Sequence, residues 1–375
     1  MSTACAAAQI IAENVDSLVT IDFHARGIVE PIYRAARARQ GGQPLAYRAA
    51  LALAGACAPS EGGIYARPTV IIGTGFMIRA AGAPETDGIT GAALLARGLT
   101  MAHRAIPLIV SEEAAIDVLQ AACSAAGLAP AIVRNGAGDE MQVASAVEAF
   151  RCGADVGVPP VVLVSFPLDR NKALAAAQSM ASAIAPQAMI SIERPGLNRR
   201  GVHHNSWGRS ISDITACVDE LFLELRRRGT LTVAIGDLGN ELGMGCISDT
   251  VEWMTPFGRE CSCPCGGGMA CSIESDVTVV GSVSDDVAYG ILACMAHLSG
   301  QPEVLPSPEL GLAVLDAAVA AGAVDGLTGE RSASIDMLDA YVHSSILQLL
   351  KAILDYADRH TSLRPEFLTH LASFQ

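Results

Sequence analysis

The sequence predicts an α/β protein built on a doubly wound, mostly parallel sheet, with helices on both faces and extra helices at both termini. From about Thr69 onward, short apolar runs alternate with longer segments of helical periodicity. Parallel neighbours need crossover connections, so this alternation favours a parallel sheet covered on both faces. The 375-residue chain is 51% hydrophobic but only 4% aromatic, and a core of Ala, Val, Ile and Leu suits helices packed closely on branched strands.

Seven short apolar runs predict the strands of this sheet. They are Thr69–Ile72, Pro107–Val110, Ala131–Val133, Val161–Val164, Ala188–Ile192, Leu231–Ile235 and Val277–Val280. The segments between and after them repeat apolar residues at helical spacing and predict helices at Thr90–His103, Glu112–Ala126, Glu140–Phe150, Asp169–Ala185, Ser212–Arg228, Asn240–Met254 and Asp285–Leu298. Together these elements predict an α/β catalytic core at residues 64–300.

Helical patterns flank this core on both sides. Residues 1–63 form a predicted N-terminal helical region, with the pattern at Ile10–Ala58. Residues 301–375 form a predicted C-terminal helical region, with helices at Pro308–Gly322 and Ser334–Arg359. The second of these is amphipathic enough to pack on the body or on a partner subunit, which favours a homodimer. We expect both ends to be structural cover for the core.

Charge and cysteine content narrow the function classes. The chain has 25 Lys and Arg against 39 Asp and Glu, a net charge of -14, and such a surface repels phosphate backbones, so nucleic acid is not an expected partner. No apolar run reaches the ~20 uninterrupted residues that a membrane span needs, and no secretory signal is legible at Met1–Ile11. Eleven cysteines without an export signal predict reduced thiols and a cytoplasmic location.

The first loop of interest follows the first predicted strand. Sheets of this class bind ligands beyond the carboxyl ends of the strands, where loops lead into helix N-termini. Gly73, Thr74 and Gly75 stand at that position, and Asp87 precedes the next helix. Glycines let the backbone turn and direct its N–H groups at a carboxylate or phosphate; a tight strand exit without a ligand is the alternative. A dinucleotide site would need glycine where Ile78 stands, so no nucleotide cofactor is expected.

The second loop begins where the fifth predicted strand ends. The strand runs directly into Glu193 and Arg194, which places a carboxylate and a guanidinium at the edge of the sheet, and two adjacent histidines follow. Histidine supplies proton transfer near neutral pH or a metal ligand. Consecutive residues of an extended chain point in opposite directions, so we expect at most one of His203 and His204 to face a shared site. Ser212 is expected to cap the next helix.

The third loop follows the sixth predicted strand. Asp237 stands just past the strand, and Asn240 and Glu241 open the segment predicted as a helix, where exposed backbone donors favour anions. Glycines near Asp237 indicate that the backbone approaches something closely, which favours a functional role for this carboxylate. The alternatives are a turn-forming Asp237 and a Glu241 that only stabilises the first turn of a helix.

A fourth feature is a cysteine-rich tract with thiols at Cys261, Cys263 and Cys265 and another at Cys271. Thiolates at this density can bind zinc or an iron–sulfur cluster. The spacing matches neither a paired zinc site nor a ferredoxin sequence, and no second half is nearby in the chain. We therefore expect a flexible loop of reactive thiols, with a metal site as the alternative.

Taken together, the quoted loops resemble the D-glutamate cyclase family. The matching motifs are Gly73–Phe76, Glu85–Gly88, Ser191–Gly196 and Gly236–Gly245, in the same order within a similarity that runs from roughly Asp16 to Leu298. The resemblance implies conversion of D-glutamate to 5-oxo-D-proline (pyroglutamate) with loss of water, which is the reaction of a carbon–oxygen lyase (hydro-lyase). It also implies a divalent metal such as Mn²⁺.

The chain departs from the family pattern at two places. Members usually read Gly-Asp-Gly-Gly-Asn-Glu, whereas Leu238 holds the third position here. They also tend to carry Ser-Asn-Trp-Gly where this chain has Ser284, Asp285, Asp286 and Val287. Loss of a tryptophan and gain of two acids at the edge of the sheet predict a shift toward a more cationic substrate.

The chemistry of cyclisation suggests a role for each loop residue. The amine must lose a proton before it attacks the side-chain carboxyl, and charge on the carboxyl oxygens must be offset. Proton transfer is assigned to Glu193 and Glu241, with Asp237 also catalytic, and the metal is assigned to Asp87 and Asp237. The residues assigned to substrate binding are Gly73, Thr74, Gly75, Arg194, His204, Asn205 and Asn240.

Two alternatives of different classes stay open. One is another enzyme on the same scaffold, a related cyclase, hydrolase or isomerase that acts on another amino acid or lactam, which the departure at Asp285 and Asp286 favours. The other is a small-anion binding protein without turnover, which predicts thermal stabilisation by a ligand but no product.

Overall fold

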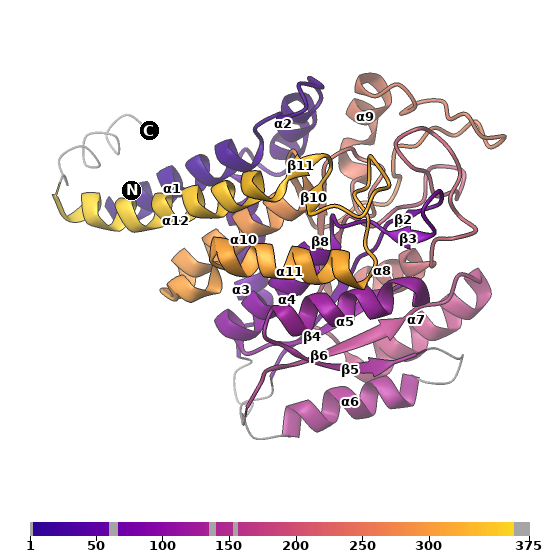
Figure 1. Cartoon of the computed structure of the whole chain (residues 1–375), viewed down its shortest axis with the longest axis horizontal. Helices are drawn as coiled ribbons and strands as arrows, with labels where there is room; N and C mark the ends of the chain where they lie inside the picture. The colour runs from indigo at the N-terminus through magenta and orange to yellow at the C-terminus, as the bar shows by residue number, and fades with distance from the viewer. Residues whose placement is uncertain (1–2, 60–66, 135–139, 153–156, 364–375) are drawn as a thin grey trace.

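Seven parallel strands form one central sheet in the order β5-β6-β4-β1-β7-β8-β9. The computed structural model describes residues 3–59, 67–134, 140–152 and 157–363 (Figure 1). All seven predicted strands are confirmed: β1 (Thr69–Gly73), β4 (Ile106–Ser111), β5 (Ala129–Val133), β6 (Pro160–Ser165), β7 (Ala188–Ile192), β8 (Leu231–Gly236) and β9 (Val277–Val280). Except at the edge strand β5, their near-continuous burial is typical of parallel strands covered on both faces.

The order of the strands confirms the doubly wound prediction. From β1 the chain first builds β4, β5 and β6 on one side and then returns to build β7, β8 and β9 on the other. The order reverses between β1 and β7, whose pairing ends at Gly73 and Ser191. Ligands bind at this kind of switch point, beyond the carboxyl ends of the strands. The topology therefore directs attention to the loops after β1, β7 and β8.

Helices cover both faces of the sheet. One face carries α3 (Leu45–Ala56), α10 (Ser284–Ser299), α4 (Ile89–His103) and α5 (Ile116–Ala125), and the other carries α6 (Glu140–Cys152), α7 (Arg170–Ile184) and α8 (Val218–Arg227). The close contact of α4 with α10 requires glycine, because a Cβ on Gly98 would lie 2.1 Å from Cδ2 of Leu292. Small residues thus allow the tight layers that the low aromatic content predicts.

The two ends of the chain add an outer layer. Helices α1 (Thr3–Val19) and α12 (Ala340–Leu363) lie side by side and pack on α10, while α11 (Pro308–Ala321) packs on α4 and α5 (Figure 1). Helix α2 (Val29–Arg39) lies against β9. One continuous apolar core extends from Ile11 to Leu350. The three-part division of the chain stays a prediction, but its ends share one core with its centre.

One described stretch has the length and apolar composition of a membrane span. It comprises Pro302–Ala321, which in the fold is a short 3₁₀ turn, η3 (Pro302–Val304), followed by α11. Helix α11 packs on α4, α5 and α12. The stretch therefore takes part in the helical layers of the fold.

The helices predicted at Ser212–Arg228 and Asn240–Met254 begin later than expected. Helix α8 begins at Val218, because residues 212–217 form a loop in which Ser212 Oγ accepts a hydrogen bond from the backbone N–H of His203; the prediction that Ser212 caps the helix is wrong. The predicted helix at Asn240–Met254 is reduced to η2 (Gly245–Ile247) and α9 (Ser248–Met254). A left-handed backbone at Gly243, with φ of +97°, prevents an earlier start.

The C-terminal region contains a hairpin that the sequence does not predict. Strands β10 (Ser334–Ile335) and β11 (Leu338–Asp339) pair antiparallel ahead of α12, so the predicted helix at Ser334–Arg359 is wrong over its first residues. Asp336 and Met337 form the turn with φ of +52° and +63°, the two left-handed positions of a type I′ turn. A second hairpin, β2 (Met77–Ile78) with β3 (Ala83–Pro84), follows β1. Both hairpins contribute residues to the lining of the cavity described below.

Candidate active site

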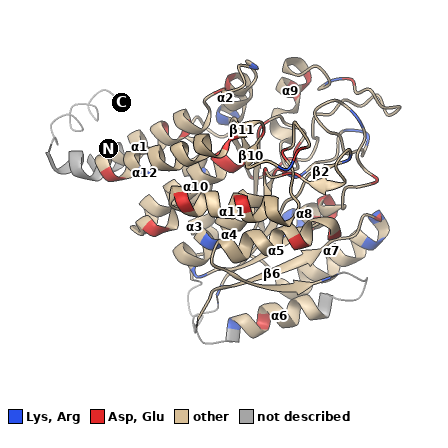
Figure 2. Cartoon of the chain, in the orientation of Figure 1, with Lys and Arg blue, Asp and Glu red and all other residues tan. Residues whose placement is uncertain are grey.

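A cavity of about 350 Å³ lies beyond the carboxyl ends of β1, β7 and β8. Its volume falls within the range of small-molecule sites. Acidic residues gather in this part of the molecule, beside β10 (Figure 2). The charged residues that line the cavity are Glu85, Glu193, Asp237 and Asp336 together with Arg79 and Arg209. A cavity with groups of both signs suits a molecule that carries both signs itself.

Glu193 occupies the first position after β7 and has a strained backbone. Its φ is +39°, in the left-handed region, which costs an ordinary residue about 1 kcal/mol or more. The side chain is 7% exposed, and Ser284 at the start of α10 donates a hydrogen bond to its Oε2 at 2.6 Å. Strain of this kind clusters at functional sites, where the geometry matters more than the local energy.

Glu193, Asp237 and Glu241 converge as predicted. One oxygen atom from each of the three carboxyl groups lies within 4.8 Å of the others. Three stretches of the chain, after β7, after β8 and at the start of α10, therefore meet at one point. The expected proximity of Glu193 and Asp237 is therefore observed, and their catalytic roles stay a prediction.

Glu241 builds the loop after β8. Its carboxylate accepts backbone N–H hydrogen bonds from Asp237, Leu238 and Gly239, which wraps the loop around it. Burial raises the pKa of Glu241 to about 8, and the charge of Asp237 adds to this effect while the backbone donors oppose it. Gly239 is required here, since its φ is +90° and a Cβ would lie 2.2 Å from Val251. Glu241 does not line the cavity itself.

Asp237 is paired with a residue from the N-terminal region. Its Oδ2 lies 3.0 Å from Nη2 of Arg26, and only 2% of the carboxylate side chain is exposed. Arg26 belongs to the loop between α1 and α2, and the same nitrogen donates to the carbonyl of Ser282. The proximity of Asp237 raises the pKa of Arg26 despite burial, which lowers it. The N-terminal region thus supplies a charged group to the site as well as cover.

The buried carboxyl groups raise one another's pKa. Burial raises the pKa of Glu85, Asp87, Glu193 and Asp336 well above their ordinary values, and the neighbouring carboxylate charges raise it further. Burial beside other acids therefore favours the protonated form of each of these four carboxyls. A carboxyl whose pKa is raised in this way is better able to donate and accept protons near neutral pH than an exposed one.

The donor set of Glu193, Asp237 and Glu241 fits a hard divalent cation. Such ions take carboxylate oxygen ligands, and these three groups lie close enough together to share one ion. The excess of buried negative charge in the same place is a second observation in favour of a cation. The structure therefore supports a divalent metal in general terms.

Asp87, predicted as a metal ligand, has a structural task. Its two oxygens accept N–H hydrogen bonds from Gly88, Ser284 and Asp285, the last two at the start of α10. Asp285 reciprocates at the start of α4, where it accepts N–H hydrogen bonds from Gly88 and Gly91 and the hydroxyl of Thr90. The two aspartates cap each other's helices, which fixes α4 against α10.

Asp286, the second acid at the place where the chain departs from the family pattern, pairs with another buried residue of the protein. Asp286 Oδ1 lies 2.9 Å from Nδ1 of His343 on α12, and both side chains are buried. The charge of Asp286 raises the pKa of His343 against the effect of burial. Neither Asp285 nor Asp286 lines the cavity. The two additional acids therefore do not present charge to a substrate there.

Arg194 lies inside the protein and does not line the cavity. Its guanidinium donates to the carbonyls of Thr74, Gly75 and Ala216 and pairs with Glu112, 2.6 Å from its Oε1. The side chain is fully buried. Arg194 therefore links the loops after β1, β4 and β7 through contacts inside the protein.

The loop formed by Gly73, Thr74 and Gly75 also packs inside the protein. Gly75 has φ of +101°, and a Cβ there would lie 2.3 Å from Oγ of Ser111. None of the three residues lines the cavity. The glycines permit close packing of the loop, which agrees with the alternative of a tight strand exit without a ligand.

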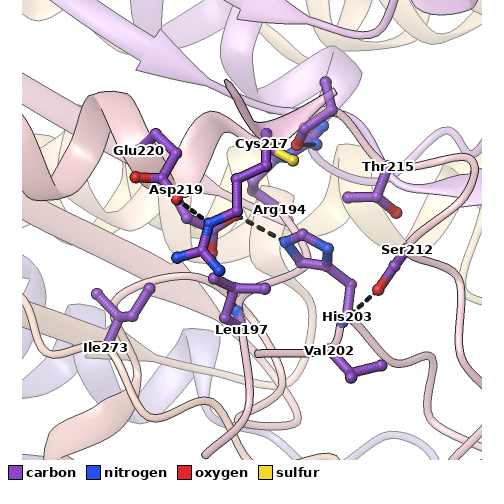
Figure 3. Close-up of polar contacts among 12 residues, drawn as sticks. Arg194, Leu197, Val202, His203, Ser212, Thr215, Cys217, Asp219, Glu220 and Ile273 are labelled. Carbon is purple, nitrogen blue, oxygen red and sulfur yellow. Dashed lines mark hydrogen bonds and ion pairs between the residues drawn. The ribbon is translucent and has the colours of Figure 1, made fainter. Parts of the chain in front are cut away.

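The two adjacent histidines point in opposite directions, as predicted. His203 is directed at α8, where its Nε2 lies 2.7 Å from Oδ2 of Asp219 (Figure 3). His204 is fully buried and turns toward the cysteine-rich tract. Neither lines the cavity, whereas the neighbouring Asn205 and the more distant Asn240 do. Asn240 Oδ1 is buried and has no hydrogen-bond partner among the described residues.

Sequence reasoning missed several charged residues that line the cavity or contact its lining residues. Glu85 belongs to the Glu85–Gly88 motif of the family resemblance, so the sequence did contain a pattern that could have identified it as a site residue. Asp336 comes from the unpredicted β10–β11 turn, and Arg79 comes from the β2–β3 hairpin, where its guanidinium pairs with Asp213. Arg26 lies in a loop without periodicity. Only the folded chain shows that these residues meet.

The fold and the cavity define an α/β protein with a carboxyl-rich small-molecule site at the switch point of a doubly wound sheet. The family model described as D-glutamate cyclase-like, C-terminal, matches residues 15–351, and the chain belongs to this family. A similar protein is the mitochondrial D-glutamate cyclase of Homo sapiens, 31% identical over 111 residues. That match spans 29% of this chain and 17% of the human protein.

Without bound metal, the protein is expected to lose stability as the pH rises from about 4.5 to about 8. The folded-state pKa values of Asp285 and Glu241 are raised to about 7 and about 8 from 3.8 and 4.5. The folded state therefore holds protons that the unfolded state has released, and the free energy of unfolding falls with rising pH. Thermal melting in chelator should show this fall.

Addition of Mn²⁺ should raise the melting temperature more at pH 8.5 than at pH 6.5, since a cation offsets ionised carboxylates. A sodium chloride sample of equal ionic strength is the control for screening. A melting temperature that rises with pH in chelator, or an equal effect of sodium and manganese, would contradict the account of the buried acids.

Proposed function

We propose that this protein cyclises D-glutamate to 5-oxo-D-proline with loss of water. Membership of the D-glutamate cyclase-like family supports a cyclase. The observation that carries the proposal is the placement of Glu193, a buried carboxyl on a strained backbone with raised pKa, at a cavity that Asp237 also lines. A raised pKa moves a carboxyl from its ordinary range toward neutral pH, which favours its use in proton transfer.

Ring closure forms one bond and breaks another. The α-nitrogen attacks the side-chain carboxyl carbon, a C–N bond forms, and a C–O bond breaks. The ammonium group gives up two protons, the departing oxygen takes up two, and water leaves. Glu193 can accept a proton from nitrogen and return it to oxygen, with its carboxyl oriented by the hydroxyl of Ser284. Asp237 is held by Arg26 beside it.

The two signs of charge in the cavity match those of glutamate. Arg209 has a guanidinium available to a carboxylate, with Arg79 nearby in its pair with Asp213. Glu85 and Asp336 are acids available to the ammonium group. Asn240 Oδ1 offers an unused acceptor to the nitrogen. Binding that brings the amine to the carboxyl removes the orientational cost of closing the ring.

Asp237 and Glu241 would hold a divalent ion such as Mn²⁺, with the carboxyl of Glu193 beside them for proton transfer. When bound, this ion would supply positive charge to offset charge on the carboxyl oxygens. The three residues would also lose their mutual repulsion. Asp87 keeps its place as the cap of α10 in this proposal.

Product analysis tests the proposal directly. The purified protein is incubated with D-glutamate and with L-glutamate, with manganese or with chelator, and products are separated on a chiral column and weighed by mass spectrometry. We expect 5-oxo-D-proline from D-glutamate, more with manganese than with chelator. Turnover of another amino acid or lactam instead of D-glutamate would show that the substrate is a different one. Thermal stabilisation by D-glutamate without any product would favour a binding protein.

Two further expectations accompany this proposal. A homodimer is proposed from the amphipathic α12, where Tyr341, Leu349 and Tyr356 are exposed, and light scattering measures it. A cytoplasmic location is proposed from the cysteine content, and cell fractionation measures it; the human relative is described as mitochondrial.

A further inference from the structure

The cysteine-rich tract meets a histidine from a distant loop. Side-chain atoms of Cys261, Cys263, Cys265 and His204 all lie within 4.8 Å of one another. The sulfur of Cys261 is 3.5 Å from that of Cys263 and 3.3 Å from that of Cys265. These sulfurs are too far apart for a disulfide bond, which requires about 2.05 Å. The fourth group, absent from the neighbouring sequence, is supplied by the fold.

The distances match a tetrahedral metal site. With Zn–S bonds of about 2.3 Å and a Zn–N bond of about 2.05 Å, neighbouring sulfurs of a tetrahedron lie about 3.8 Å apart and sulfur and nitrogen about 3.6 Å apart. His204 Nε2 lies 3.2 Å from the sulfur of Cys263 and 3.6 Å from that of Cys265. A small adjustment of side chains would place all four atoms around one ion.

The imidazole of His204 is set in the form that binds a metal. Its Nδ1 lies 3.1 Å from the carbonyl oxygen of Val202. A carbonyl oxygen only accepts hydrogen bonds, so Nδ1 carries the proton and Nε2 presents its lone pair to the cysteines. Metal-binding histidines have their second nitrogen fixed in this way. This observation is independent of the clustering of the thiols.

A backbone donor and a side-chain donor reach the sulfur of Cys265. The N–H of Gly267 donates to the sulfur of Cys265 at 3.4 Å, and Nδ2 of Asn198 does so at 3.5 Å. Donors aimed at sulfur favour the thiolate that a metal requires. His204 is fully buried and Cys261 is 8% exposed. The four groups are therefore partly enclosed and hydrogen-bonded.

We propose that Cys261, Cys263, Cys265 and His204 form a structural zinc site. Three thiolates and one imidazole complete the tetrahedron that zinc prefers, with no open position for a substrate. On binding, the three thiol protons pass to solvent and three Zn–S bonds and one Zn–N bond form. No change of oxidation state takes place.

The site fastens two long irregular segments together. Residues 193–217 connect β7 to α8, and residues 255–276 connect α9 to β9, without helices or strands of their own. Segments of this length need another source of order. The carbonyl of His204 accepts a hydrogen bond from Nδ2 of Asn240, and Asn205 and Arg209 of the same segment line the cavity. The zinc site would therefore hold one wall of the cavity.

Metal content is the first test. The wild-type protein, expressed with added zinc and dialysed against metal-free buffer, is analysed by inductively coupled plasma mass spectrometry. We expect about one zinc per chain, loss of that zinc in Cys263→Ser, and its retention in Cys246→Ser, since Cys246 lies outside the cluster and contacts Thr278. Retention in Asp237→Asn would separate this site from the carboxyl cavity.

Cobalt replacement gives a second measurement on the unaltered protein. Co²⁺ in the zinc site should give tetrahedral d–d absorption and thiolate-to-cobalt charge-transfer bands, and zinc should displace it. Zinc-free protein with all thiols free to react, iron in place of zinc, or octahedral cobalt bands would each overturn the proposal. An equal zinc content in Cys263→Ser and wild type would do the same. None of these results depends on turnover of D-glutamate.

Discussion

Replacement of Glu193 by glutamine is expected to reduce kcat for D-glutamate by about 10²- to 10⁴-fold, the usual contribution of a proton-transfer group. Glutamine keeps the size of the side chain and its hydrogen bond with Ser284 but cannot take up and return a proton. The folded protein should persist, because removal of one acid relieves repulsion among buried carboxyls. Initial rates and thermal melting measure the two effects.

Glu309→Gln is the matched control for Glu193→Gln. Glu309 is exposed at the start of α11 and has no part in the cavity. Its variant should turn over D-glutamate at the wild-type rate. If Glu193→Gln also kept that rate while folding normally, Glu193 would have no role in proton transfer.

Replacement of Arg194 by alanine is expected to lower the free energy of unfolding by about 3–5 kcal/mol, the usual cost of breaking a buried ion pair. The change removes the hydrogen bonds to three backbone carbonyls and leaves the carboxylate of Glu112 buried without its partner. The loops after β1, β4 and β7 lose their common link. Urea unfolding followed by circular dichroism measures the loss.

The result for Arg194 separates a structural role from a substrate contact. Arg34→Ala is the control, since Arg34 forms an exposed ion pair with Glu30 on α2, worth about 0–1 kcal/mol. A variant of Arg194 with unchanged stability and a raised KM would show that this guanidinium reaches the substrate, contrary to its complete burial.

The fold could be predicted because its determinants are local. Each strand is an apolar run bounded by polar or glycine-containing turns, and the alternation with helices requires a parallel sheet. The rule that ligands gather beyond the carboxyl ends of strands then placed Glu193 and Asp237 together. Both follow strands that lie side by side, β7 and β8. The proximity of Glu193 and Asp237 could therefore be predicted from the order of the strands in the sheet.

The errors arise where distant contacts decide the outcome. Arg194 follows the same strand as Glu193, but Glu193 lines the cavity whereas Arg194 is held inside the protein by Glu112 and by backbone carbonyls. The turn at Asp336 and Met337 lacks the Asn-Gly pair that usually marks this geometry. The cysteine tract has no fourth group in its own part of the sequence, because His204, which lies beside the thiols, comes from another loop. These contacts join residues that are far apart in the sequence, so no short sequence pattern predicts them.

The account depends on one claim, that the buried carboxyls around Glu193 act on a small molecule in the adjoining cavity. A crystal structure of the Glu193→Gln variant with D-glutamate tests this claim most directly, since the substrate should bind without reacting. We predict D-glutamate in the cavity, with its nitrogen within hydrogen-bonding distance of the side chain at position 193 and close to Asp237. D-glutamate bound at another place, or with its nitrogen turned away from both side chains, would contradict the claim.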